Sequence, residues 1–110
     1  MATASRADQE AFVAAFLAAC REIPSVRRAS IGRRIKTGAG YEAKIGDVAY
    51  SHAAIIEFES VDGLRAYLSD ALHARVGQLF WKVCEAPLVL DVELADASTI
   101  AVGELLVERQ

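Results

Sequence analysis

Hydrophobic residues near the start of the chain recur every three or four positions, which is the spacing of one face of a helix. Phe12, Phe16 and Cys20 lie on one such stripe, within a helix that we predict over residues 7–22. Pro24 ends this helix, because proline lacks the backbone N–H that a continuing helix needs. One face of the helix is therefore predicted to pack against a core.

Two later segments alternate apolar and polar residues, as half-buried β-strands do. They cover residues 26–36 and 48–59, and a glycine-rich loop over residues 37–47 separates them. In the second segment, His52 falls on the same face as Phe58, since side chains an even number of positions apart point to the same side of a strand.

A second helical pattern follows the second strand. Ser60 is a suitable N-cap, and the pattern continues to about Ser69. We predict a kink at residues 70–72, after which the helix resumes and extends to about Cys84, before Pro87.

The chain closes with two apolar segments, residues 88–94 and 99–108, which we predict to be strands joined by a turn. The last segment is almost continuously apolar, as is typical of a strand covered on both faces. The predicted order is helix, strand, strand, helix, strand, strand, in a single domain over residues 1–110.

Composition and charge narrow the class of protein. The 110 residues are 54% hydrophobic and 25% charged, which is too apolar for a disordered chain and too interrupted by charge for a membrane span. The net charge of −3 argues against general nucleic-acid binding. Cys20 and Cys84 lack the spacing of a metal or redox motif, and we expect free thiols in a cytoplasmic protein with no cofactor and no metal.

The first strand is unusually basic. It holds five of the twelve cations of the chain: Arg27, Arg28, Arg33, Arg34 and Lys36. They are either a basic arm for RNA or an acidic ligand, or charges that protect a sheet edge from unwanted pairing. We favour edge protection, because no aromatic residues are interleaved for stacking against bases.

The sequence Tyr-Ser-His-Ala-Ala-Ile-Ile-Glu-Phe-Glu-Ser at residues 50–60 is followed by Tyr67 and, six residues later, by His73. This stretch resembles the stress-responsive A/B barrel family. The resemblance implies a ferredoxin-like α+β fold, with an antiparallel four-stranded sheet and two helices on one face. It also implies a homodimer that pairs through its sheet faces into an α/β barrel, and that dimer would cover Ile55 on the open face.

One departure from the family is the missing strand at the start of the chain. In a ferredoxin-like sheet of order 4-1-3-2, its absence leaves an empty position beside the fourth strand. Residues 99–108 would fill that position in the required antiparallel direction. We therefore expect a circular permutation, with this strand placed within the subunit or exchanged with the partner.

The same resemblance implies a site. On an unbroken helix Tyr67 and His73 lie about 240° apart, so only a bend brings them to one side. With the bend, Tyr67, His73 and His52 would converge between the second helix and the sheet. Relatives that act as polyketide cyclases look similar at these positions. The resemblance therefore implies that His73 is a general base, that Tyr67 stabilises an enolate and that His52 orients the substrate. The alternative is that each is structural, as buried histidines and tyrosines often are.

Two functions follow from the resemblance. The favoured one is a small stress-response protein that binds an apolar or carbonyl-bearing ligand in a pocket between helices and sheet. The other is a polyketide cyclase or lyase that uses His73 and Tyr67. Apolar lining with both polar groups within reach of one point would favour the enzyme, and side chains already bonded to the backbone would favour the binding protein.

Overall fold

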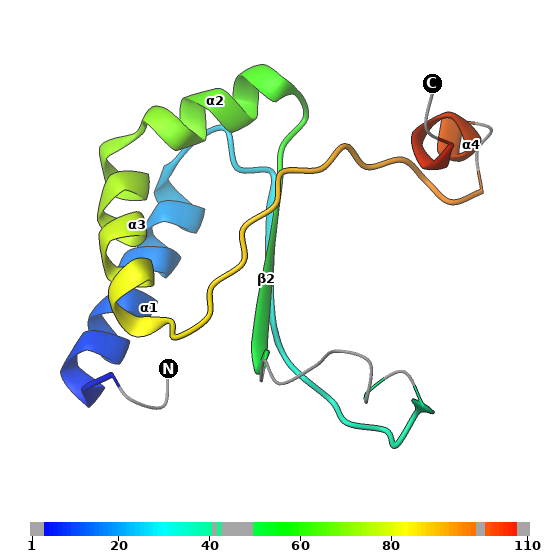
Figure 1. Cartoon of the computed structure of the whole chain (residues 1–110). Helices are drawn as coiled ribbons and strands as arrows, with labels where there is room; N and C mark the ends of the chain where they lie inside the picture. The colour runs from blue at the N-terminus through cyan, green and yellow to red at the C-terminus, as the bar shows by residue number, and fades with distance from the viewer. Residues whose placement is uncertain (1–3, 41, 43–49, 99–100, 108–110) are drawn as a thin grey trace.

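The structure, a computed structural model, describes residues 4–40, 42, 50–98 and 101–107. Its elements are α1 (Arg6–Glu22), β1 (Arg28–Arg33), β2 (His52–Glu57), α2 (Val61–Ser69), α3 (Ala71–Val83) and α4 (Ala101–Leu106). Helices α1–α3 lie together on one side of the β1–β2 hairpin (Figure 1). An extended segment leads from α3 to α4, which lies apart from the other helices.

Helix α1 begins and ends as the pattern predicts. Ser5 Oγ accepts a hydrogen bond from the backbone N–H of Asp8 at 3.1 Å, which satisfies one of the free donors at the helix start. The helix packs antiparallel to α3, so that Phe12 lies 6.1 Å from Phe80 between ring centroids and Lys82 Nζ lies 3.3 Å from Asp8 Oδ1. The two helices form the main packed layer of the molecule.

The core lies where α1, α2 and α3 meet. Its buried cluster consists of Phe16, Ala19, Ile23, Tyr67 and Val76. Ile56 and Phe58, from the end of β2 and just beyond it, pack against this cluster with Val26. The hairpin therefore joins the helices at one end.

Strands β1 and β2 are antiparallel and pair in register from Arg28 opposite Glu57 to Arg33 opposite His52. Both strands are shorter than the predicted segments, which extended beyond the paired residues at each end. Ile31 is 63% exposed and Ile55 is 57% exposed, although they lie on opposite faces of the hairpin. Apolar side chains on both faces of the ladder thus remain in contact with water.

The predicted C-terminal strands are not present. Residues 88–94 are extended but form no ladder with any described strand, so the described sheet has two strands instead of the four predicted. Residues 101–106 form helix α4, and the prediction of a strand there is wrong; residues 99, 100 and 108 lie outside the described residues. Ala101, Glu104 and Leu105 are strong helix formers, and a continuous apolar run does not by itself distinguish helix from strand.

The helical tail also leaves the expected circular permutation without support, because no described residue of the tail enters the sheet. The radius of gyration is 16.3 Å, compared with about 13 Å for a compact domain of this size. Among the described residues, no helix is both long enough and apolar enough to cross a membrane.

Candidate functional site

The break between α2 and α3 is made by a single residue, Asp70. Its backbone N–H donates to the Tyr67 carbonyl at 3.2 Å and so closes α2. Its side-chain Oδ1 accepts from the N–H of Leu72 at 2.8 Å, and its carbonyl accepts from Ala74 at 3.1 Å, so it also caps the start of α3. The predicted kink is confirmed, and an aspartate forms it without help from proline.

The break brings Tyr67 and His73 together. Their ring centroids lie 4.5 Å apart, with an angle of 53° between the ring planes. On a continuous helix the two side chains would point about 240° apart, so this contact depends on the change of direction at Asp70. The geometry confirms that the two residues share one location.

Tyr67 is almost completely buried, with 4% of its surface exposed, and its ring lies 5.2 Å from that of Phe58. Burial raises the pKa of its hydroxyl, and the negative charge of the Cys20 thiolate raises that pKa further. The phenol is therefore held in its neutral form, which can donate a hydrogen bond. None of the described residues accepts one from it.

His73 carries the least satisfied polar atom of this region. The side chain is half-buried, but its Nδ1 atom is fully buried and has no hydrogen-bond partner among the described residues. An unpaired buried polar atom costs about 1–3 kcal/mol, and such atoms are rare in folded proteins. Imidazole Nδ1 either donates or accepts, depending on the tautomer, so a small polar group can pair with it in either state.

Ser25, in the segment between α1 and β1, is in a similar condition. Its Oγ is buried without a partner among the described residues, and its Cβ lies beside Gly63 of α2. Sequence reasoning missed this residue, because a serine after proline is typical of an ordinary turn. Only the fold shows that this turn is covered by α2.

His52 does not join Tyr67 and His73. It stands at the start of β2, whereas Phe58, which contacts Tyr67, follows the end of that strand. Six residues of extended chain span about 20 Å. The exposed His52 instead has its Nδ1 2.8 Å from Ser51 Oγ.

The two cysteines are free, as predicted, and half-buried. Burial raises the pKa of both the Cys20 and the Cys84 thiol, which keeps them protonated and unreactive at neutral pH. No group of three or more potential metal ligands is found in the described parts of the chain.

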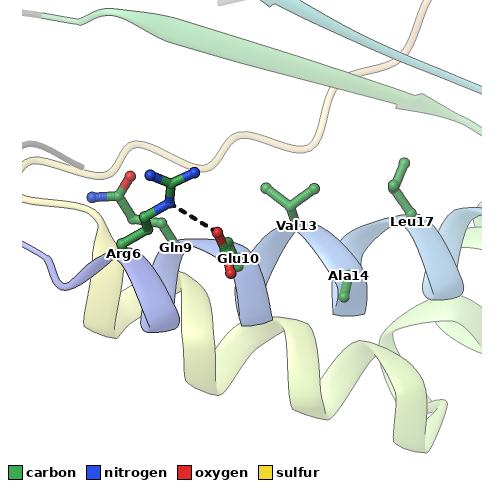
Figure 2. Close-up of a pocket in the computed structure, with 6 residues that line it drawn as sticks. All are labelled: Arg6, Gln9, Glu10, Val13, Ala14 and Leu17. Atoms are coloured by element: carbon green, nitrogen blue, oxygen red, sulfur yellow. Dashed lines mark hydrogen bonds and ion pairs between the residues drawn. The ribbon is translucent and has the colours of Figure 1, made fainter.

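A hollow of about 520 Å³ lies along the side of α1 that α3 leaves uncovered. It is lined by Arg6, Gln9, Glu10, Val13, Ala14 and Leu17. Figure 2 shows Val13 and Leu17 pointing from α1 toward the side on which the hairpin lies, while an ion pair of 3.0 Å between Arg6 and Glu10 forms one end. Val13 is 47% exposed, because the apolar stripe of α1 is wider than the part that α3 covers.

A family model described as the Stress Responsive A/B Barrel Domain matches residues 2–94. The chain belongs to the stress-responsive A/B barrel domain family. No curated protein and no solved structure matches it.

The family match covers the α1–α3 layer, the hairpin, Tyr67 and His73. It also includes the extended segment 88–94 and ends before α4. Membership in the stress-responsive A/B barrel family implies an α+β barrel fold, and the helices and antiparallel hairpin described above agree with the α+β class.

Proposed function

We propose that this stress-responsive A/B barrel protein is a homodimer that binds a small apolar or carbonyl-bearing ligand between its helices and its sheet. The observation that carries the site is the buried Nδ1 of His73, which has no described partner, on a ring in contact with the neutral Tyr67 ring. The second candidate below shares this observation, and we put binding first because the family description names no reaction. Two polar groups held side by side among apolar residues are typical of a small-molecule site.

The ligand chemistry follows from what these groups offer. Tyr67 supplies a hydrogen-bond donor suited to a carbonyl oxygen, and His73 Nδ1 supplies a second polar contact. The exposed Val13 and Leu17 supply apolar surface on the same helical layer. The hollow of about 520 Å³ on α1 is a separate surface, since neither Tyr67 nor His73 lines it.

The proposed dimer follows from apolar surface that one subunit leaves uncovered. Leu90 is 72% exposed within the extended segment 88–94, which forms no described ladder. Fully burying an aliphatic side chain of this size contributes about 1.5–3 kcal/mol. A second copy, with its own open sheet face, would bury these residues and complete a four-stranded sheet in each half of the barrel.

The second candidate is a cyclase or lyase that acts on a poly-β-ketone or a similar carbon acid. It is favoured by the 4.5 Å ring contact and by the absence of a described partner for His73 Nδ1. His73 would remove the acidic proton between two carbonyls, and Tyr67 would donate to the developing enolate oxygen. The orienting role of His52 is not available within the same subunit, because His52 lies at the far end of β2.

A long-chain alkyl β-keto ester tests both candidates, since it carries an apolar tail and an acidic C–H between two carbonyls. Binding is measured by calorimetry, and enolisation by NMR, as the rate of deuterium exchange at that carbon. His73→Gln and Tyr67→Phe should each weaken binding by about tenfold, equivalent to one hydrogen bond of about 1.4 kcal/mol. The exposed His52→Gln variant serves as the control.

If the protein accelerates deuterium exchange and His73→Gln abolishes that acceleration, the cyclase or lyase is supported. Binding without accelerated exchange would support the ligand-binding protein. Equal binding by all variants would refute the site.

A further inference from the structure

A second hollow, of about 390 Å³, lies at the end of the hairpin that does not contact the helices. It is lined by Arg33, Arg34, Lys36, Tyr50, Ser51 and His52. The site described above is separated from it by the length of β2, about 20 Å. Nothing in the proposed binding of a carbonyl compound involves these residues.

The end of the β1–β2 ladder builds this hollow. Arg33 and His52 form the last registered pair, and the N–H of Arg34 donates to the carbonyl of Ser51 at 2.7 Å. Because paired positions alternate in an antiparallel ladder, Arg33 and His52 form a non-hydrogen-bonded pair, whose side chains lie closest. Beyond this pair both segments leave the sheet, and Lys36 and Tyr50 complete the lining.

The charges that the described residues bring to the hollow are all of one sign. Within that part of the chain, its lining holds three cations and no carboxylate. At the other end of β1, Arg27 pairs with Glu59 at 3.0 Å and Arg28 approaches Glu57 at 3.7 Å. In the described ranges, by contrast, none of the three cations of the hollow forms an ion pair.

Edge protection does not account for this arrangement. A charge that protects a sheet edge needs only to point into water. Here three cations gather around one concave space together with a tyrosine ring, a hydroxyl and an imidazole. Gathered cations repel one another in a chain whose net charge is −3, and a bound anion would remove that repulsion.

We propose that this hollow binds the phosphate group of a small organic phosphate. Arg33 and Arg34 are the principal phosphate ligands, because the guanidinium group donates two parallel hydrogen bonds to phosphate oxygens. Lys36 adds a point charge, and the Ser51 hydroxyl and His52 imidazole, 2.8 Å apart, add short polar contacts. Tyr50, which is half-exposed, offers a surface for the organic part.

The test uses calorimetry on the full chain at about 50 mM and about 200 mM salt, with two small probes, phenyl phosphate and inorganic phosphate, and with a single-stranded oligonucleotide for comparison. Arg33→Gln and Arg34→Gln should each weaken phenyl phosphate binding by about tenfold, the loss expected for one charge-assisted contact. Arg27→Gln is the matched control, since it removes the same charge from the same segment but from outside the hollow. These side chains are on the surface, and thermal unfolding checks that each variant remains folded.

Weaker binding by the two hollow variants, with the control unchanged, supports the proposal. If phenyl phosphate binds more tightly than inorganic phosphate, the ligand is an organic phosphate. If the two bind equally, the ligand is the free anion and the role of Tyr50 is refuted. Equal weakening in Arg27→Gln overturns the site, since it shows only a diffuse charge effect. Saturable binding of a single-stranded oligonucleotide without binding of either small probe also overturns it.

Discussion

Replacing Asp70 by alanine tests whether the α2–α3 break positions His73 against Tyr67. The variant loses the 2.8 Å hydrogen bond from the Leu72 N–H to Oδ1, and loss of an N-cap of this type costs about 1 kcal/mol. Alanine also favours a continuous helix over aspartate by about 0.5 kcal/mol. The balance between a bent and a straight α2–α3 segment therefore shifts by about 1.5 kcal/mol, or slightly more than tenfold.

A straight segment cannot keep both rings in place, because Tyr67 and His73 would then point about 240° apart. Tyr67 and Val76 belong to the same buried cluster, so straightening would also remove one of them from the core. We expect Asp70→Ala to lower the free energy of unfolding by about 1 kcal/mol and the melting temperature by about 4–8 °C.

Two measurements check this expectation. Thermal unfolding reports the lost cap, and the NMR signals of the His73 ring report its distance from the Tyr67 ring, which shields protons held over its face. Asp70→Asn is the matched control, because asparagine keeps an oxygen that caps a helix about as well as aspartate does. Identical melting temperatures and identical His73 signals for the alanine and asparagine variants would refute the role assigned to the Asp70 side chain.

Two further predictions concern the pH response and the assembly. The pKa of Tyr67 is raised in the folded state, so its contribution to stability is complete below the ordinary value of 10.0. This contribution is lost as the pH rises above that value, because the phenol ionises more readily in the unfolded chain than in the folded one. Denaturant unfolding across this pH range measures the loss, which should be absent in Tyr67→Phe. Leu90→Asp should convert the proposed dimer to monomer in sedimentation velocity, because it places a charge in the apolar segment 88–94. The equally exposed Leu106→Asp, in α4, should not, and a dimer that survives Leu90→Asp would remove this segment from the interface.

Helices α1 to α3 are well predicted from sequence because their signals are local. The apolar stripe around Phe16 and the proline at residue 24 act within a few residues of one another and agree, and the cap found at Ser5 is equally local. The bend at Asp70 instead depends on the family resemblance, which implies one site for Tyr67 and His73. Tyr67 and His73 can meet only if the helix is interrupted between them.

The placement of His52 shows where such reasoning fails. Alternation correctly assigns His52 and Phe58 to one face of a strand, but a shared face does not mean a shared location along a strand of about 3.3 Å per residue. The helices cover only the Phe58 end of that face. Which part of a strand is covered depends on the packing of distant segments, and the periodicity of the strand carries no information about it.

The C-terminal errors have a different cause. A pattern of apolar residues reports the surroundings for which a segment is suited, and segment 88–94 is suited to a covered strand. Such a strand needs a neighbour that supplies hydrogen bonds, and within one subunit the described hairpin supplies none to it. The same mismatch occurs at Ile31 and Ile55, whose pattern indicates burial although both are more than half exposed. These residues lie in the hairpin and the extended segment and not in the packed helices, so the surroundings that a single subunit lacks are those of a sheet. The homodimer proposed above would supply them, with the same contacts made by both copies.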